Sequence, residues 1–162
     1  AGKLSVENGA HIVTQQFLDS FLILSGSGIT FGLVVAMLFA AKSKQYKALG
    51  KVAAFPAIFN VNEPVVFGFP IVMNPVMFLP FILVPILAAI IVYTSIAIGF
   101  MHPFSGVTLP WSTPAIISGF MVGGWQGAFV QVLVLATSTV VYFPFFKFQD
   151  NLAYNNELQA EK

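Results

Sequence analysis

Asn60, Asn62 and Glu63 are the residues of this chain best suited to chemistry, because they place two amides and a carboxylate within four positions. Pro64 bounds the segment, so its backbone presents donors and acceptors in fixed directions. A carboxylate accepts strong hydrogen bonds from hydroxyl groups because it is charged, and it can act as a base toward one of them. The segment predicts a site that grips several hydroxyls, as a sugar site does, with Glu63 as its catalytic candidate.

Glu63 is also the one charged side chain between Lys51 and Lys147. A charge at bilayer depth costs about 2.5–3.5 kcal/mol, so it needs a partner or a purpose. The structural alternative is a buried carboxylate that pairs with a residue outside the given sequence. Because ionisable groups inside membranes are functional by default, we favour a functional role for this one.

Two further segments could supply polar groups to such a site. Ser25-Gly26-Ser27-Gly28 presents amides and hydroxyls at the start of a helix, where partial positive charge attracts electronegative groups. Pro110-Trp111-Ser112-Thr113-Pro114 is a rigid corner whose aromatic ring can stack on a sugar face. The binding candidates, beyond the first three residues, are therefore Ser25, Gly26, Ser27, Trp111, Ser112 and Thr113.

Each of these two segments has a structural interpretation of equal weight. Gly28 and Gly32 form a pair of small residues four apart, as do Gly119 and Gly123, and such pairs let membrane helices pack closely. Trp111 could instead be an anchor at the membrane interface. Residue types alone leave both alternatives open.

Composition predicts the fold class. Hydrophobic residues make up 57% of the chain and charged residues 8%, against roughly 45–50% and about 25% in soluble domains. Two segments, 76–100 and 126–146, are long enough to cross a bilayer, which takes about 20 mainly apolar residues. We therefore predict an all-α integral membrane protein with two complete crossings.

The remaining apolar segments are too short or too rich in proline to cross alone. Residues 15–24 and 29–41 are expected to be two arms of a helix that is broken at the glycine-rich segment. Residues 53–74 and 102–124 carry several prolines each and are expected to form re-entrant or hairpin segments. Residues 148–162 are polar, and we expect a loose cytoplasmic tail or linker.

Lysines predict the orientation of these segments. Lys42, Lys44, Lys47 and Lys51 are expected to lie in a short loop after the broken helix, and Lys147 follows the second crossing. An excess of lysine beside membrane helices is typical of the cytoplasmic side. Both ends of the pair of crossings are therefore placed in the cytoplasm.

Several functions are disfavoured. The chain has no cysteine, and neither His11 nor His102 has a partner at ligand spacing, so we expect no metal site and no thiol chemistry. A net charge of +1 without a basic stripe argues against nucleic acid. No nucleotide-binding motif is present, and we expect no cofactor. The chain begins at Ala1 without an initiator Met, and we expect it to be a piece of a longer polypeptide.

These motifs resemble a known family. The segment around Glu63, residues 59–75, closely resembles the signature of the membrane IIC component of bacterial sugar phosphotransferase (PTS) permeases, in the subgroup for lactose, cellobiose and chitobiose. The residues that carry the resemblance are Phe59-Asn60-Val61-Asn62-Glu63-Pro64-Val65-Val66-Phe67-Gly68-Phe69-Pro70-Ile71-Val72-Met73-Asn74-Pro75. It extends to His11-Ile12-Val13-Thr14, the glycine-rich segment, the Trp111 corner and Tyr142-Phe143-Pro144-Phe145-Phe146-Lys147.

The resemblance implies a multi-pass, homodimeric permease of the bacterial inner membrane that binds a β-linked disaccharide. A cytoplasmic IIB protein, itself supplied by IIA, would phosphorylate the sugar from a phosphocysteine, so this chain does not carry that cysteine. Residues 1–147 would be the C-terminal part of the IIC sugar-binding domain. Glu63 matches the family's sugar-contacting Glu, with Asn60 and Asn62 as neighbours. The family's upstream His-containing sugar-contact segment is absent here, and Ser25 stands where two glycines more often open the break.

Two other functions are weighed against this one. A proton- or ion-coupled secondary sugar transporter also uses broken helices and a carboxylate near the membrane centre. It would deliver unmodified sugar and depend on the ion gradient. A membrane scaffold without transport would tolerate the loss of the Glu63 carboxylate and would gain no stability from a sugar.

Overall fold

The computed structural model describes residues 21–24, 26–69, 71, 73–101, 109–110 and 112–161. All regular structure within these residues is helical. The helices are α2 (Phe31–Ala40), α3 (Lys44–Ile58), α4 (Glu63–Gly68), α5 (Pro75–Ala97) and α6 (Ile117–Ala160). The expected all-α class is therefore confirmed, and α5 and α6 are long and apolar enough to cross a membrane.

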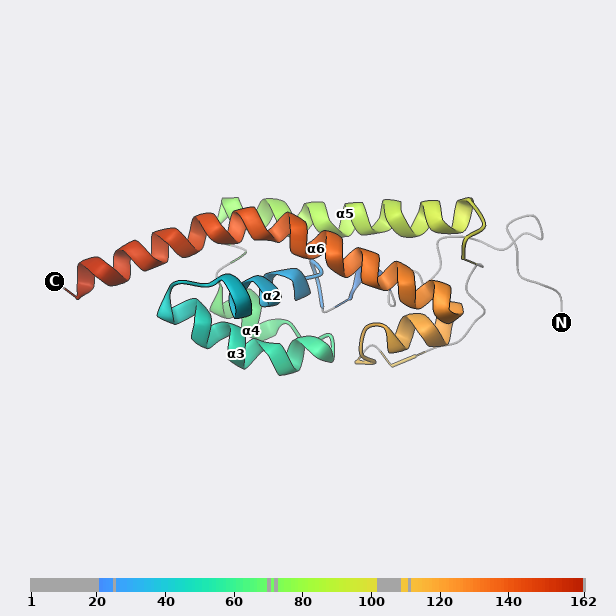
Figure 1. Ribbon diagram of the computed structural model, residues 1–162, viewed down its shortest axis with the longest axis horizontal. Helices are drawn as coiled ribbons and strands as arrows, with labels where there is room; N and C mark the ends of the chain where they lie inside the picture. The colour runs from blue at the N-terminus through green and yellow to red at the C-terminus, as the bar shows by residue number, and fades with distance from the viewer. Residues whose placement is uncertain are drawn as a thin grey trace.

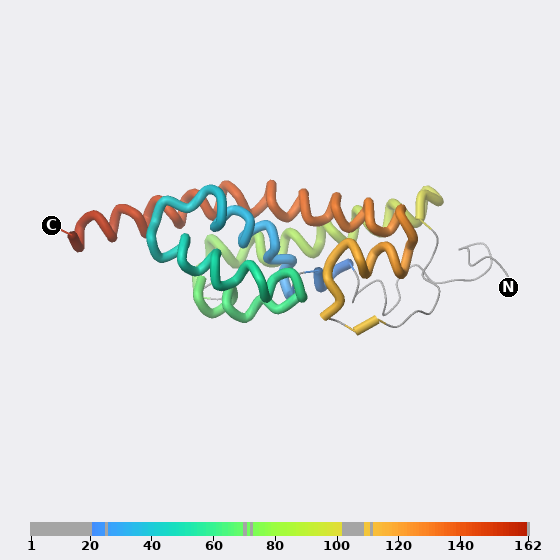
Figure 2. Tube along the Cα trace, turned by 60° about the horizontal axis from the view of Figure 1, so that its bottom comes forward, coloured from blue at the N-terminus to red at the C-terminus, as the bar shows by residue number. Residues whose placement is uncertain are grey.

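The helices lie along one long axis (Figure 1). α5 and α6 run antiparallel and in contact, and α2 packs on the inner side of α6. α3 turns back beside α2, and α4 packs against α3 (Figure 2). The two segments that were predicted to cross therefore pack against each other, α2 packs against α6, and α3 and α4 follow on α2.

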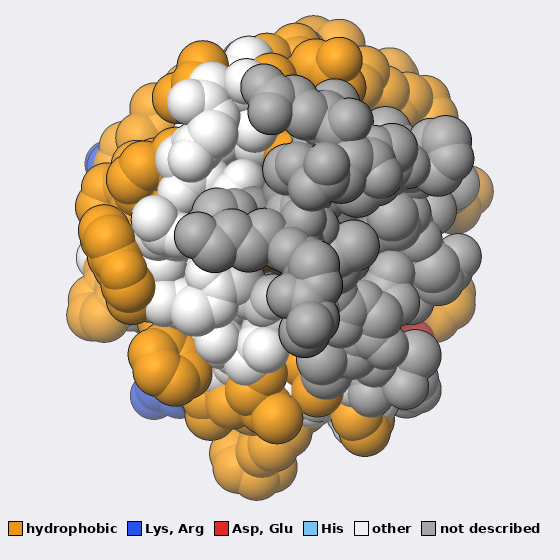
Figure 3. Space-filling model, turned by 90° about the vertical axis from the view of Figure 1, so that its right-hand side faces the viewer, with side chains coloured by type: hydrophobic (Ala, Val, Ile, Leu, Met, Phe, Trp, Pro, Cys, Tyr) orange, Lys and Arg blue, Asp and Glu red, His pale blue; other side chains and the backbone are white. Residues whose placement is uncertain are grey.

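Hydrophobic side chains cover much of the outside. Figure 3 looks at the end where α6 reverses, and the described side chains around the rim of this view are mostly apolar. Large exposed residues on the two long helices include Leu79, Ile86 and Ile90 on α5 and Phe129 and Val140 on α6. Water would not stabilise such a surface, whereas lipid or further protein would.

α5 begins with a capped first turn. The Asn74 side-chain oxygen accepts a hydrogen bond from the Val76 amide at 3.0 Å, and Pro75 takes the first helical position. Asn at the cap and Pro at the first position both suit a helix start, because the missing proline N–H needs no partner there. The helix then continues through Pro80 and Pro85.

α6 consists of two helical pieces that meet at a sharp reversal. Gly124 has φ 64° and ψ −157°, a conformation open to glycine but not to residues with a side chain. The first piece folds back on the second so closely that a Cβ on Gly127 would lie 2.3 Å from the Gly119 carbonyl oxygen. The described part of residues 102–124 thus lies in one arm of a hairpin, and the other arm is the part of α6 that follows Gly124. A hairpin is present, as expected, but its bounds differ.

The hairpin expected within residues 53–74 is also present, with different bounds. Its arms are α3 and α4, and the chain reverses at residues 59–62. Asn60 takes φ 62° in this turn, a left-handed conformation that Asn tolerates better than most residues. The first arm begins at Lys44, earlier than expected, and contains Pro56 close to its end.

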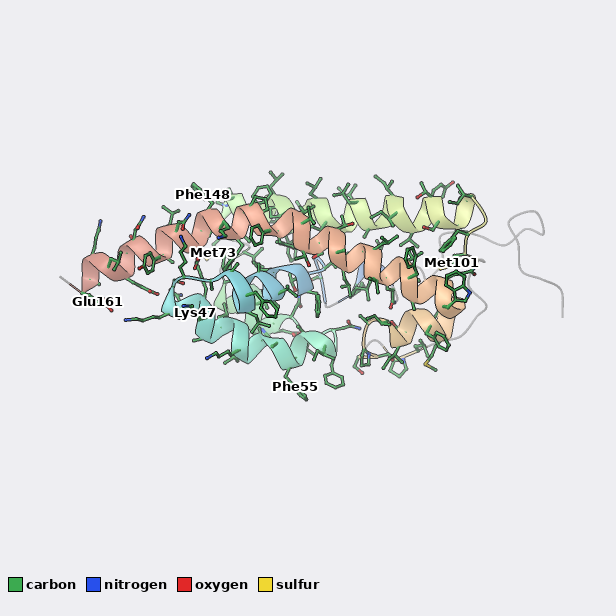
Figure 4. The ribbon with its side chains drawn as sticks, in the orientation of Figure 1. Lys47, Phe55, Met73, Met101, Phe148 and Glu161 are labelled. Carbon is green, nitrogen blue, oxygen red and sulfur yellow. The ribbon has the colours of Figure 1, made fainter. Side chains whose placement is uncertain are left out.

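The expected lysine loop is wrong in part, because Lys44, Lys47 and Lys51 lie on α3. The Ser43 hydroxyl caps this helix by accepting a hydrogen bond from the Tyr46 amide at 3.2 Å. Figure 4 places Lys47 and Glu161 toward one end of the molecule and Met101 toward the other. The lysines and the C-terminal end of α6 therefore share one end.

The expected loose tail is also wrong, since α6 continues to Ala160. Two carboxylates on this extension bind the backbone at the start of α3. Asp150, fully buried, accepts from the Lys42 and Ser43 amides at 2.7 and 3.0 Å. Glu157 accepts from the Lys44 and Gln45 amides at 3.0 and 3.1 Å. The first amides of a helix lack intrahelical acceptors, so these carboxylates dock α6 on α3 and keep the extension helical.

Replacing Asp150 with Ala should therefore destabilise the protein. Hydrogen bonds to a charged acceptor contribute about 1.5–3 kcal/mol each, and the buried Ser43 amide would lose its bond outright. The Lys42 amide is part-buried and can bind water instead, so we expect a total loss of about 2–4 kcal/mol. Thermal unfolding of the full-length protein in detergent measures it. Glu161→Gln is the control, because the Glu161 pair with Lys44 is exposed and should contribute nothing measurable. An Asp150→Ala protein with the same melting temperature as the wild type would contradict this account.

Candidate functional site

The structure brings together the three segments that the sequence singled out. The side-chain nitrogen Nδ2 of Asn62 donates to the Ser27 carbonyl oxygen at 2.7 Å, which ties the α3–α4 turn to the glycine-rich segment. The side-chain nitrogen Nδ2 of Asn60 donates to the Thr113 carbonyl oxygen at 3.0 Å, which ties the same turn to the proline-bounded corner. The two hydrogen bonds join residues that are 35 and 53 positions apart in sequence, so the turn at Asn60 and Asn62 connects all three segments.

Asn62 fits this position because Gly26 makes room for it. A Cβ on Gly26 would lie 2.3 Å from the Asn62 Cγ, and Gly26 has φ +82°. Both the close contact and the left-handed backbone require glycine here. The glycine-rich segment is thus a true break: its described residues are in turns, and α2 begins only at Phe31.

Asn60 and Asn62 are each 7% exposed, and both amide nitrogens bind backbone oxygens. Glu63 differs, because it is exposed in the first turn of α4. Its carboxylate makes no ion pair and no hydrogen bond with any residue that the structure describes. The amides therefore hold the site together, while the carboxylate is available to a ligand.

Ser27 and Ser112 are likewise exposed. The Ser27 carbonyl is the one that binds Asn62, and Ser112 precedes Thr113, whose carbonyl binds Asn60. The Thr113 hydroxyl donates to the Pro110 carbonyl oxygen at 2.7 Å and so closes its own turn. Ser25 and Trp111, also predicted as binding residues, lie outside the described residues, as do His11 and His102. Among the described side chains, no group of three or more metal-ligating residues occurs.

Comparison with known proteins identifies the family. A family model described as "Phosphotransferase system, EIIC" matches residues 1–85. The chain belongs to this family. The helices α5 and α6 are accordingly those of a membrane protein, and the all-α membrane fold class is confirmed.

Individual EIIC relatives are similar over nearly the whole chain. The lichenan permease IIC component of Bacillus subtilis (strain 168) is 45% identical over 152 residues, 93% of this chain and 34% of the relative. The cellobiose-specific EIIC component of Geobacillus stearothermophilus is 43% identical over 142 residues, 86% of this chain and 32% of the relative.

A solved EIIC structure is similar as well. The crystal structure of the transporter ChbC, the IIC component from the N,N'-diacetylchitobiose-specific phosphotransferase system, superposes with a TM-score of 0.87 at 40% identity. The match covers 90% of this chain and 34% of ChbC. The chain thus spans about a third of the length of the relatives it matches.

Three α6 side chains that were not predicted as site residues hold the segments of the candidate site. Tyr142 Oη donates to the Gly28 carbonyl oxygen at 2.7 Å, and Ser138 Oγ donates to the Ile29 carbonyl oxygen at 2.5 Å. Gln131 holds the second hairpin through the Ile116 amide and the Ser118 hydroxyl. The sequence indicates these residues only through their spacing. Residues 131, 138 and 142 are seven and four positions apart, which places polar side chains on one face of an apolar helix.

The glycines of the break serve packing as well as conformation. A Cβ on Gly32 would lie 2.4 Å from the Ser138 backbone carbon, and one on Gly28 would lie 2.3 Å from the Phe81 ring. α2 therefore approaches the α6 backbone directly at Gly32. The packing interpretation of this segment is supported, and it is compatible with a binding role for Gly26 and Ser27.

A hollow on the surface lies away from this site, between the start of α3 and the end of α6. No predicted site residue lines it; its lining includes Gln45, Tyr46, Leu152, Asn156 and Glu157. Burial, with a smaller contribution from the Asp150 carboxylate, raises the pKa of the Tyr46 phenol, so it stays neutral. The hollow therefore offers hydroxyl and amide groups but contributes nothing to the cluster around Glu63.

Gly26→Ala should displace Asn62 from its bond to Ser27. Gly99 provides a matched control, because it has φ +76° and nothing within 4 Å of an added Cβ. Both substitutions pay the cost of a left-handed alanine, about 1–2 kcal/mol. Gly26→Ala should cost about 1 kcal/mol more, the contribution of a typical hydrogen bond. Thermal unfolding in detergent measures the difference, and equal losses would mean that Asn62 does not depend on Gly26.

Proposed function

We propose that the chain is the sugar-binding part of a PTS permease, which carries a β-linked disaccharide across the bacterial inner membrane while a cytoplasmic IIB protein phosphorylates it. The observation that carries the proposal is the cluster at Glu63. Three segments converge there through Asn60 and Asn62, and an exposed carboxylate and exposed hydroxyls remain beside them. Relatives named for lichenan, cellobiose and N,N'-diacetylchitobiose agree with such a ligand.

Glu63 is the residue proposed to act on the sugar. Its carboxylate orients sugar hydroxyls by accepting their hydrogen bonds, and these bonds are strong because the acceptor is charged. It then accepts the proton of the hydroxyl that attacks the phosphorus. The oxygen–phosphorus bond forms as the sulfur–phosphorus bond of the IIB phosphocysteine breaks. Phosphoryl transfer depends mainly on positioning and charge stabilisation, so the membrane protein contributes without a covalent intermediate.

Other sugar contacts come from the tied segments. Gly26 and Ser27, Ser112 and Thr113 bring backbone amides and hydroxyls to the cluster, and Ser25 and Trp111 are proposed to complete it. Asn60 and Asn62 position these segments, and both are also proposed as sugar contacts. A set of fixed donors and acceptors selects a ligand by its hydroxyl pattern, because an unmatched buried group is costly.

The location and partners follow from the same proposal. The lysine-bearing start of α3 and the end of α6, which share one end of the molecule, would face the cytoplasm, where IIB, supplied by IIA, docks. Residues 148–162 would then be a cytoplasmic extension of α6. The full-length permease is proposed to be multi-pass and homodimeric, and lipid surrounds the apolar faces of α5 and α6.

The chemical form of the accumulated sugar tests the proposal. Cells that carry the full-length protein are given radiolabelled cellobiose, lactose and chitobiose. Phosphorylated sugar inside, lost when the IIB phosphate donor is removed, is the expected result and identifies the substrate. Free sugar that disappears with the proton gradient would instead favour the ion-coupled transporter.

Glu63→Gln should lower sugar binding and phosphorylation about tenfold or more while expression stays normal. The amide keeps the shape of the side chain but removes the charged acceptor, whose hydrogen bonds contribute about 1.5–3 kcal/mol. Binding of radiolabelled sugar to purified protein measures the change.

Glu161→Gln is the matched control for this substitution, because Glu161 is an exposed carboxylate at the far end of α6. It should leave binding unchanged. Equal sugar binding and uptake by the Glu63→Gln and wild-type proteins would remove Glu63 from the site.

A further inference from the structure

We infer that Ser138 and Tyr142 of α6 are positioning residues of the sugar site: they set the backbone of residues 27–29, on which the contacts beside Glu63 depend. The inference rests on the proposed function, since it concerns the same site. Neither side chain belongs to the three predicted segments. Both reach that site from a helix more than 100 residues further along the chain.

Three successive carbonyl groups of the break are each held by a different side chain. Asn62 binds the Ser27 oxygen at 2.7 Å, Tyr142 binds the Gly28 oxygen at 2.7 Å, and Ser138 binds the Ile29 oxygen at 2.5 Å. With their carbonyl groups fixed in sequence, the peptide planes between these residues are fixed as well. The direction of each amide and side chain in the segment follows from them.

The conformation that these bonds hold is one that the segment would not adopt alone. Gly26, Gly28 and Ile29 have φ of 82°, 78° and 50°. A left-handed conformation is strained for a β-branched residue such as Ile29, so it persists where surrounding contacts over-determine it. Ser138 supplies such contacts twice, because its hydroxyl also accepts from the Gly32 amide at 3.2 Å.

Both hydroxyls are fully buried, so water cannot replace them. Without the Tyr142 hydroxyl, the Gly28 carbonyl would be a buried acceptor with no donor, and the segment would move to satisfy it. The bonded path from Tyr142 to the carboxylate is short: it runs through Gly28 and Ser27 to Asn62, which precedes Glu63. A shift at Gly28 therefore reaches the site through one further hydrogen bond.

The test compares Tyr142→Phe and Ser138→Ala in the full-length protein. Each removes one hydroxyl, and we expect each to raise the dissociation constant for radiolabelled cellobiose, lactose or chitobiose, whichever binds the wild type, at least fivefold. Val134→Ala is the stability control, because Val134 is fully buried on the same helix and makes packing contacts alone. It should lower the melting temperature but leave the dissociation constant unchanged. Tyr154→Phe, on the exposed end of α6, should change neither quantity.

The inference is overturned if Tyr142→Phe and Ser138→Ala bind sugar within twofold of the wild type, or if Val134→Ala weakens binding as much as they do. Should Tyr142→Phe fail to fold, the smaller change Ser138→Ala decides alone. Glu63→Gln, measured in parallel, separates the two proposals. Weakened binding in Glu63→Gln but not in the α6 variants rejects the positioning role alone, whereas a wild type that binds none of the three sugars rejects both.

Discussion

Backbone groups outside regular helices must find hydrogen-bond partners within the protein wherever lipid replaces water, and the rest of this structure depends on how they do so. The partners come largely from the buried face of α6. Gln131 binds the backbone of the second hairpin, and Ser138 and Tyr142 bind the backbone of the helix break. Asp150 binds the backbone at the start of α3. All four are fully buried. The long piece of α6 that follows Gly124 thus holds these three segments at defined heights along its axis.

The site is a consequence of this arrangement. Once α6 fixes the break and the second hairpin, the α3–α4 turn joins them through the Asn60 and Asn62 amides. The two amides that looked most like sugar ligands in the sequence therefore also act as ties between segments. Glu63, which has no partner among the described residues, is the group that this framework leaves accessible. Under the proposed function, stability and ligand binding are divided between neighbouring residues of one motif.

Local chemistry made part of this predictable. The glycine-rich break and the two long apolar segments depend on residues that are neighbours in sequence, and the structure has a break and two long apolar helices there. The predictions were wrong where the hydrogen-bond partners lie far apart in sequence. Residues 148–160 read as a loose tail because Asp150 and Glu157 appear solvated in sequence, whereas they bind amides at residues 42–45, more than 100 positions away. Ser138 and Tyr142 were not predicted as site residues for the same reason.

The most direct test of the account is sugar protection of cysteine labelling, because residues 1–162 contain no native cysteine and any cysteine elsewhere in the full-length protein is first replaced with Ser. Ser27→Cys and Ser112→Cys report on two of the converging segments in the full-length protein, and Gln159→Cys, exposed near the end of α6, is the control. If the segments form one site, sugar should slow maleimide labelling at positions 27 and 112 with the same half-saturating concentration, and leave position 159 unaffected. Protection at one of the two positions alone would contradict a shared site.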